Sequence, residues 1–339
     1  MQRLVLDGPN ALHWEDTAEP ALDGPGQALV RPIAVATCDI DPAILQGRFP
    51  LPGPYAFGHE GVAEVIAVGA EVTSVLPGDR VVVPFQISCG ACDSCRRGRT
   101  GNCTSHPLMS SYGLGPMGGL EWGGFWSDLV VVPHADAMLV PLPAGVDPAT
   151  VASASDNIAD AYRTVAPHLA ADPGAEVLVL GGPAAASIGL YAAGLAVALG
   201  SARAVYLDTD PERLAIAAKL GADPIEGTPT ERVGRFPVTV EAAGGAKALV
   251  AAIRATANDG HCTSVSVQTQ DVALPMLEMY SRCCTFHTGR AHARPTIPPI
   301  LDLVATGRFD PSLVTTRTVA WDDSIEALLE SPVKLVATR

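Results

Sequence analysis

Four cysteines in one short segment have the spacing of a metal-binding loop. The segment CGACDSCRRGRTGNC places two overlapping C-x-x-C steps before a fourth cysteine, and its cysteines are Cys89, Cys92, Cys95 and Cys103. Four thiolates at this spacing can surround one tetrahedral Zn²⁺. Such a closed site is structural, because it leaves no coordination position for a substrate. The alternative for this segment is a pair of disulfides or chance clustering.

A second, more dispersed set of residues could hold a catalytic metal. Cys38 lies in TCDID, His59 in FGHEGVAEV and Asp156 in ASASDNIADAYR. A thiolate, an imidazole and a carboxylate are three suitable zinc ligands, and a catalytic zinc keeps one further position open. The alternatives are a buried thiol for Cys38 and a helix N-cap for Asp156.

A glycine-rich turn predicts a dinucleotide site. The stretch AEVLVLGGPAAASIGLYAAGLAVALG reads as strand, turn and helix, and Gly181, Gly182 and Gly189 are its candidates for close approach to a pyrophosphate. Pro183 stands where the second glycine of G-x-G-x-x-G is expected. The next strand ends in Asp208, an acid that can accept hydrogen bonds from the ribose hydroxyls and repel a 2′-phosphate. We therefore predict NAD rather than NADP, with a solvated strand-end acid as the alternative.

Two kinds of element must position these residues. In a chain of 339 residues we expect two domains. Short apolar runs such as GVAEVIAVGAEV and DRVVVPF, separated by turn signals, predict a mostly β domain over about the first 150 residues. From 154 onward, brief apolar strands alternate with Ala-rich helices, which is typical of a parallel sheet covered on both faces. We therefore predict an α/β protein with a Rossmann-type, doubly wound domain.

Composition excludes some classes of function. The net charge of −14 argues against a nucleic-acid partner, because the chain lacks the clustered Lys and Arg that neutralise phosphates. No apolar stretch is long enough to span a bilayer, and the N-terminal residues do not read as a secretory signal. We therefore expect a cytoplasmic protein, in which cysteines are metal ligands or buried thiols rather than disulfides.

Over essentially its full length the chain resembles the zinc-dependent alcohol dehydrogenases of the medium-chain dehydrogenase/reductase family. The resemblance rests on Cys38, GHE at 58–60, the four-cysteine lobe at 89–103, GGFWSDLVVVP at 123–133 and the nucleotide domain. It implies a GroES-like catalytic domain of residues 1–153 and 288–339, an inserted Rossmann domain of residues 154–287, and a substrate site in the cleft between them. It also implies two zinc ions per chain and a homodimer or homotetramer.

Carried over residue by residue, the resemblance makes Cys38, His59 and Asp156 the catalytic zinc ligands. Glu60 then becomes the acid beside the metal that can exchange with its water. Asp41 matches the aspartate that orients the ligating histidine and raises its basicity.

On the cofactor side, Arg213 matches a basic residue near the adenosine ribose, although it could instead pair with Asp210. Asp39 is unusual, because this position in vertebrate relatives is an arginine that contacts the pyrophosphate.

The implied reaction transfers a hydride between NAD(H) and an alcohol, aldehyde or ketone, with zinc as the Lewis acid. By resemblance Phe49, Phe85 and Trp122 line the substrate pocket, and with Ile40 they predict an apolar substrate. Relatives place Ser or Thr at the position of Ile40, and some a His at that of Ala43, to pass the proton outward.

In this chain neither Ile40 nor Ala43 can pass the proton outward, because neither side chain can donate or accept a hydrogen bond. Either water or an acid such as Asp39 or Glu60 carries the proton, or the enzyme is a zinc-containing reductase of C=C or C=N bonds in a biosynthetic pathway. A further alternative is a nucleotide-binding protein without turnover, suggested by Pro183 and Asp39.

Overall fold

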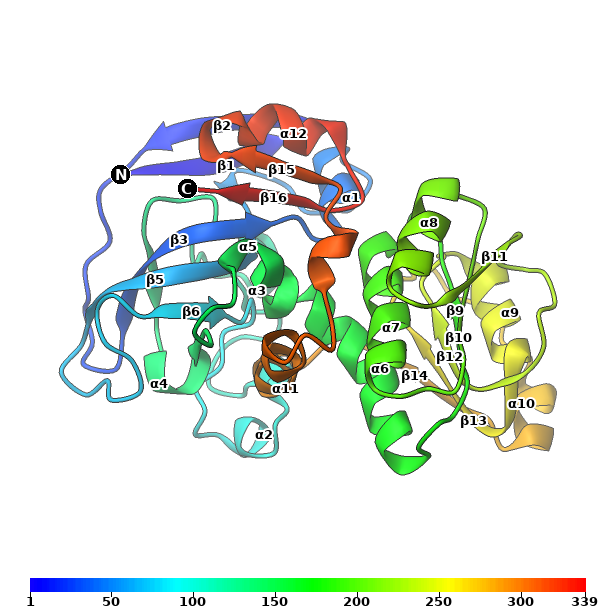
Figure 1. Cartoon of the computed structure of the whole chain (residues 1–339). Coiled ribbons are helices and arrows are strands. Elements are labelled where there is room, and N and C mark those ends of the chain that lie inside the picture. Colours follow the sequence, from blue (N-terminus) through cyan, green and yellow to red (C-terminus); the bar gives the residue numbers. More distant parts are fainter. The chain divides into compact units, whose positions relative to one another are not determined.

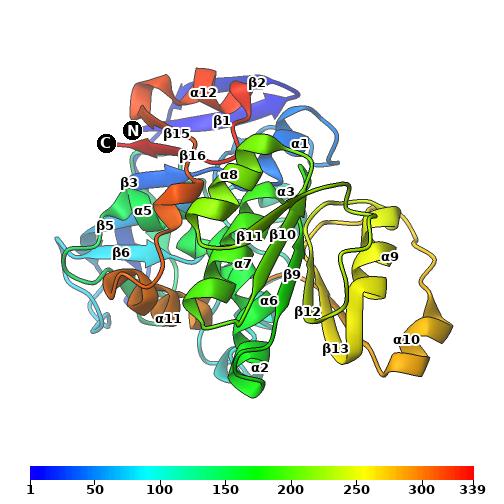
Figure 2. The same cartoon turned by 45° about the vertical axis from the view of Figure 1, so that its right-hand side comes forward.

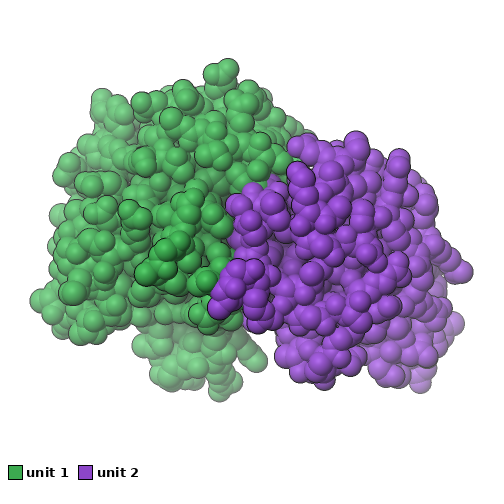
Figure 3. Space-filling model, in the orientation of Figure 1, with its two compact units in different colours: residues 1–159, 291–305, 315–339 green, residues 160–290, 306–314 purple.

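The computed structural model describes residues 1–339, which form two compact units. Figure 3 colours them separately: unit 1 comprises residues 1–159, 291–305 and 315–339, and unit 2 comprises residues 160–290 and 306–314. The segment 306–314 belongs to unit 2 because it packs there: the Phe309 ring meets Tyr191 edge to face at 6.4 Å, and Arg308 donates to the Ala198 carbonyl. The sequence-based boundaries did not separate this segment from the C-terminal part of the chain.

Unit 1 is built on two sheets. The smaller is antiparallel, in the order β2-β1-β4, with strands β1 (Gln2–Gly8), β2 (Ala11–Asp16) and β4 (Tyr55–Ala56). The larger has the order β15-β16-β3-β5-β6-β8, with β7 also paired to β3. Its strands are β3 (Ala28–Ala36), β5 (Glu60–Val68), β6 (Arg80–Val83), β7 (Val130–Val132), β8 (Val140–Pro141), β15 (Arg317–Ala320) and β16 (Leu335–Thr338).

The strands of unit 1 form because apolar and β-branched residues fill a shared core. The interiors of β3 and β5 are buried, and the two strands run side by side in Figure 1. Their register pairs Ala36 with Glu60, so the residues just after β3 and just before β5 come together at one end of the sheet. Phe57 and Trp126 stack at 5.9 Å within the same core.

The helices of unit 1 are short, except the helix Ala293–Ala305, which follows the point where the chain returns from unit 2 to unit 1. They are α1 (Asp41–Leu45), α2 (Asp93–Arg96), α3 (Gly115–Gly118), α4 (Ala135–Met138), α5 (Pro148–Val151), α11 (Ala293–Ala305) and α12 (Ser324–Glu330), with 3-10 turns η1 (Thr100–Asn102), η2 (Ala152–Ser155) and η4 (Trp321–Asp323).

Unit 2 is a six-stranded parallel sheet in the order β11-β10-β9-β12-β13-β14. Its strands are β9 (Val177–Leu180), β10 (Ala204–Asp208), β11 (Asp223–Glu226), β12 (Phe236–Glu241), β13 (Thr256–Ser264) and β14 (Thr285–Thr288). Every residue of β9 and β10 is buried, as expected for parallel strands covered on both faces. The strand order reverses between β9 and β12, which defines the switch point of a doubly wound sheet. The predicted α/β fold is therefore confirmed.

Helices cover both faces of this sheet. Because right-handed crossovers run outward in opposite directions from the switch point, α7 (Ala186–Ala198) and α8 (Pro211–Lys219) lie on one face and α9 (Ala246–Ala255) and α10 (Met276–Arg282) on the other, as Figure 2 shows. The remaining elements are α6 (Asn157–Ala171), which leads into unit 2, and the turn η3 (Pro311–Val314). Among all these helices, none combines the length and the apolar character needed to cross a membrane.

The core of unit 1 predicts one large stability effect. Trp126 has no exposed surface, so Trp126→Ala should lower the free energy of unfolding by about 3–5 kcal/mol through lost burial and a residual cavity. Leu76 is 66% exposed, and Leu76→Ala should change it by less than about 0.5 kcal/mol. Urea unfolding followed by circular dichroism compares the two. Equal effects of both substitutions would contradict the packing described.

Candidate metal centres and dinucleotide site

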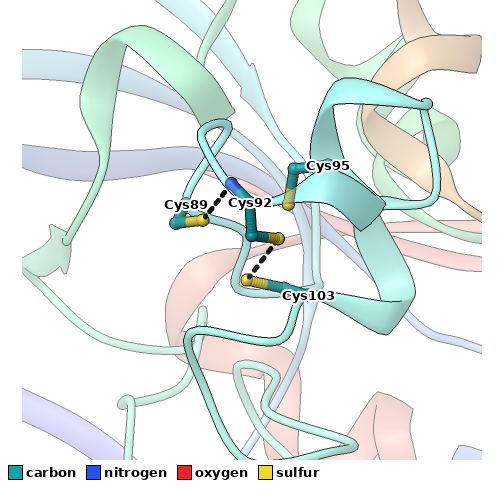
Figure 4. Close-up of side chains that lie close together, drawn as sticks. All are labelled: Cys89, Cys92, Cys95 and Cys103. Carbon is teal, nitrogen blue, oxygen red and sulfur yellow. Dashed lines mark hydrogen bonds between the residues drawn. The ribbon is translucent and has the colours of Figure 1, made fainter.

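The four lobe cysteines converge on one point. Cys92 precedes α2, Cys95 lies within it, and Cys103 follows η1, while Cys89 lies just before this segment; Figure 4 shows the four side chains together. Their sulfur atoms all lie within 4.8 Å of one another. Two ligands of a tetrahedral zinc, each about 2.3 Å from the ion, lie about 3.8 Å apart. The Cys92 and Cys103 sulfurs are 4.0 Å apart, whereas bonded sulfurs are about 2 Å apart. The spacing therefore fits a metal ion and not a disulfide.

Hydrogen-bond donors around the lobe favour thiolates. The Cys92 amide and the Ser105 hydroxyl both donate to the Cys89 sulfur, at 3.3 and 3.1 Å. The backbone N–H groups of Thr104 and Cys95 lower the pKa of Cys92 to about 5. Thiolates are the form that binds zinc, so these donors prepare Cys89 and Cys92 for a metal, whereas burial raises the pKa of Cys95 to about 12.

The second set of predicted ligands also comes together, at one end of the large sheet of unit 1. Cys38 follows β3, His59 directly precedes β5, and Asp156 follows η2. The Asp156 Oδ2 atom lies 3.1 Å from the Cys38 sulfur and 3.4 Å from His59 Nε2. Glu60 completes the group, since one candidate ligand atom from each of the four residues lies within 4.8 Å of all the others. All four residues are buried.

Local backbone geometry explains how the residues reach these places. Gly58 has φ +90°, a left-handed conformation that glycine adopts without strain, and a Cβ there would strike the Trp126 ring. This turn delivers His59 to the start of β5. On the other side, the Ser155 hydroxyl accepts a hydrogen bond from the Gly61 amide at 2.9 Å, which ties η2 to β5 and places Asp156 beside His59.

The electrostatics of this cluster suit a divalent cation. Burial, followed by Asp156 and Glu60, raises the pKa of the Cys38 thiol well above its usual range. Burial also raises the pKa of Glu60 to about 8, against the opposing effect of Lys334. Although burial alone would lower it, the hydrogen bond to Asp156 and the nearby acids raise the pKa of His59 to about 9. Crowded acids in a buried site suit a divalent cation, and a thiolate, an imidazole and a carboxylate are ligands that zinc accepts.

Asp41 lies beside His59 but does not reach it in this structure. Its Oδ2 atom accepts a hydrogen bond from the Cys38 amide at 2.8 Å, and its Oδ1 atom is 3.9 Å from His59 Nδ1. Neither that oxygen nor that nitrogen has a hydrogen-bond partner, although both are buried. A small rotation of either side chain would join them, which would orient a ligating imidazole.

Two residues at this site were missed by sequence reasoning. Asn157 has no exposed surface, and its Oδ1 atom accepts a hydrogen bond from the Cys38 thiol at 3.1 Å. Lys334 also has no exposed surface, and its ammonium lies 3.3 Å from Glu60 Oε2. Asn157 could have been suspected because it follows Asp156. Nothing in the segment SPVKLVATR signals that its lysine is buried.

The predicted pocket residues differ in their surroundings. The Phe85 ring lies 5.8 Å from the His59 ring, next to the cluster. Ile40, Phe49 and Trp122 are partly buried and pack against the core of unit 1. Trp122 also meets His106 edge to face at 5.2 Å.

In unit 2, the glycine-rich turn follows β9 as predicted and is closely packed. A Cβ on Gly181 would come within 2.6 Å of Asp208 Oδ2, and one on Gly182 within 2.7 Å of the Ala243 backbone. Both glycines line a cavity of about 280 Å³, together with Pro183, Thr228, Lys247 and other residues. Gly189 does not line this cavity; it lies in α7, and a Cβ there would be 3.0 Å from that of Ala242. The absence of a side chain at Gly189 therefore lets α7 pack closely against the sheet.

Asp208 lines the same cavity and is held by several donors. Arg213 donates to both carboxylate oxygens, at 2.7 and 2.8 Å, and the Tyr206 hydroxyl donates to Oδ2 at 3.0 Å. Although burial opposes it, Arg213 is the main cause that lowers the pKa of Asp208. Arg213 also lies 3.4 Å from Asp210, so the local ion pair suggested by the sequence exists, but its closer partner is Asp208.

Comparison with known proteins places the chain among dehydrogenases. Residues 24–144 match the family described as alcohol dehydrogenase GroES-like domain. A probable zinc-binding alcohol dehydrogenase of Mycobacterium tuberculosis is 29% identical over 331 residues, which cover 96% of this chain and 83% of the relative. The glutathione-independent formaldehyde dehydrogenase of Pseudomonas aeruginosa is 32% identical over 241 residues, covering 67% of this chain and 59% of that protein.

The fold has a close counterpart among solved structures. The alcohol dehydrogenase of Thermus sp. ATN1 matches with a TM-score of 0.89 and 29% identity, and the match covers 100% of this chain and 99% of the other.

The glycine-rich turn yields a testable prediction. Gly181→Ala should crowd Tyr206 and Asp208, lower the free energy of unfolding by about 1–3 kcal/mol, and weaken NADH binding about tenfold. Gly26→Ala is the control, because a Cβ there meets no atom within 4 Å. Thermal unfolding and NADH fluorescence titration measure the two effects. Unchanged NADH binding by the Gly181 variant would show that this turn does not contact the dinucleotide.

Proposed function

The chain belongs to the zinc-dependent alcohol dehydrogenases of the medium-chain dehydrogenase/reductase family, and on that premise we propose that it interconverts an alcohol and its aldehyde or ketone with NAD(H). The observation that carries the proposal is the buried group of Cys38, His59 and Asp156. These three side chains are of three different types and leave one coordination position for a substrate oxygen, which distinguishes the group from the closed four-cysteine lobe. We propose one zinc ion at each place.

The side chains have distinct roles in this proposal. A zinc ion held by Cys38, His59 and Asp156 would supply Lewis-acid polarisation of the substrate oxygen. Asp41 would orient the His59 ring once its Oδ1 atom closes the present gap of 3.9 Å. Burial of the whole group limits its contact with bulk water and strengthens these electrostatic interactions.

The proton route remains the unusual feature. Ile40 caps the start of α1 and offers no hydroxyl at the position where relatives carry Ser or Thr, and Ala43 offers no imidazole. We propose that water or one of the acids Asp39 and Glu60 passes the proton instead. The same feature favours a second candidate, a zinc-containing reductase of C=C or C=N bonds in which the proton need not follow this route.

For the cofactor, we propose NAD. Asp208 lines the unit 2 cavity as an ionised carboxylate, which repels a 2′-phosphate. Its pairing with Arg213 offsets part of that charge, so NADPH should be measured in parallel with NADH.

Phe85 beside His59 supports an apolar, medium-sized or aromatic substrate rather than a sugar polyol. The proposed pocket also includes Ile40, Phe49 and Trp122.

A homodimer or homotetramer is proposed as the assembly. Strand β14 is an edge strand of the unit 2 sheet, so one of its two sides pairs with no other strand of this chain. On α10, Leu277 and Tyr280 are 80% and 84% exposed, which is unusual for large apolar side chains in a monomer.

Metal analysis tests the proposed function. The wild type should contain about two zinc ions per chain and form NADH with members of a panel of alcohols, whereas Cys38→Ser should retain about one zinc and lose that activity. Cys262→Ser is the control, since it removes a buried thiol outside both clusters and should keep zinc and activity. About one zinc ion in the wild type would favour a nucleotide-binding protein without turnover.

The proton route is tested by Ile40→Thr. If proton release limits alcohol oxidation, the added hydroxyl should raise the pre-steady-state rate of NADH formation about tenfold or more. Ile40→Val is the matched control, because valine has the shape of threonine without its hydroxyl. A rate that rises equally in both variants would point to pocket volume, and no rise in either would contradict the missing-relay hypothesis.

A further inference from the structure

Lys334 is a buried lysine at the candidate catalytic centre. The chain contains three lysines, and Lys219 and Lys247 are exposed while Lys334 has no exposed surface. Burying an ammonium group costs free energy unless it is paired and hydrogen-bonded. Its partners therefore indicate why it is kept there.

The lysine connects the C-terminal strand to the candidate metal site. Its ammonium donates to the Thr37 carbonyl and lies 3.3 Å from Glu60 Oε2. Thr37 and Leu335 also exchange hydrogen bonds: the Thr37 amide donates to the Leu335 carbonyl at 3.1 Å, and the Leu335 amide donates to the Thr37 hydroxyl at 3.1 Å. These bonds, with the antiparallel pairing of β16 and β3, hold the start of β16 against the residue before Cys38. The lysine is thus placed by backbone that has little freedom to move.

Glu60 is the group that needs a restraint. A carboxylate oxygen of Glu60 lies within 4.8 Å of a ligand atom of Cys38, His59 and Asp156. A zinc ion held by four protein ligands is closed to substrate, whereas catalytic sites hold three and keep one position open. Without a partner, the Glu60 carboxylate would be drawn to a divalent cation at this short distance.

We propose that Lys334 is a positioning residue that pairs with Glu60 and prevents its carboxylate from remaining bound as a permanent fourth protein ligand of the metal. This inference rests on the proposed function in one respect, that Cys38, His59 and Asp156 hold a metal ion. It assigns Lys334 no contact with substrate. It explains why a positive side chain is buried at a site that already contains a histidine and that, in the proposed function, would also hold a metal ion.

The test uses the full chain with Co²⁺ in place of zinc, and imidazole as a probe of the open coordination position. Visible absorption of Co²⁺ reports imidazole binding without any turnover, and the four-cysteine lobe contributes a constant background because it has no open position. Four variants are compared with the wild type: Lys334→Met, Lys334→Arg, Glu60→Gln and the double variant Lys334→Met with Glu60→Gln.

We expect half-saturation of the Lys334→Met variant to need at least about tenfold more imidazole than half-saturation of the wild type, because Glu60 then occupies the open coordination position. For Lys334→Arg, the half-saturating imidazole concentration should stay within about threefold of the wild-type value, because arginine keeps the positive charge. The double variant should also come within about threefold of the wild-type imidazole concentration, because the amide of glutamine is a poor ligand of such a metal ion. It removes both charges, so it also separates the proposed effect from the cost of burying an unpaired carboxylate.

Three results would overturn the proposal: unchanged imidazole affinity in Lys334→Met, an equal loss in the single and double variants, or loss of Co²⁺ from the Cys38 site of a folded Lys334→Met chain. A raised Kd for NADH with unchanged imidazole affinity would assign Lys334 to the cofactor instead, and so would also overturn it. The proposed function fails separately, if wild-type protein binds imidazole at Co²⁺ but turns over no alcohol. The Lys334 result would still stand in that case.

Discussion

The burial of several acidic groups around His59 is the constraint on which unit 1 depends. Cys38, Asp41, Glu60 and Asp156 lie away from water, and burial raises the pKa of Cys38, Asp41 and Glu60. A buried negative charge is tolerated only when a cation or hydrogen-bond donors compensate it. Here compensation comes from His59 and Lys334, and in the proposed holoenzyme from zinc.

This constraint accounts for the placement of distant segments around one sheet end. The pairing of Ala36 with Glu60 brings the end of β3 to the start of β5, and the Gly61 amide bound to Ser155 adds η2. The C-terminal strand β16 pairs with β3 and delivers Lys334. Four parts of the chain, from residue 37 to residue 334, thus supply one site, because strand order rather than chain order sets which residues are neighbours.

Unit 2 meets a different constraint, the close approach of backbone to the side chains and backbone of neighbouring strands. Gly181 leaves no room for a side chain because Tyr206 and Asp208 fill the space beside it. Asp208 in turn is held by Arg213 and Tyr206, so its carboxylate has a fixed orientation in the cavity. The proposed nucleotide site would thus be prepared by the packing of β9 against β10 before any ligand binds.

The sequence by itself determined much about this protein. The two C-x-x-C steps, the alternating apolar strands and helices of residues 154–287, and the glycine-rich turn are local patterns, and each reports a local geometry or a metal preference directly. Through resemblance, the sequence also indicated Cys38, His59 and Asp156 as a set. Only the tertiary structure decided that their ligand atoms converge, that Gly189 packs against Ala242, and that Arg213 pairs with Asp208. It alone placed Lys334 beside Glu60, because a contact between residues 274 positions apart depends on strand pairing that no local pattern records.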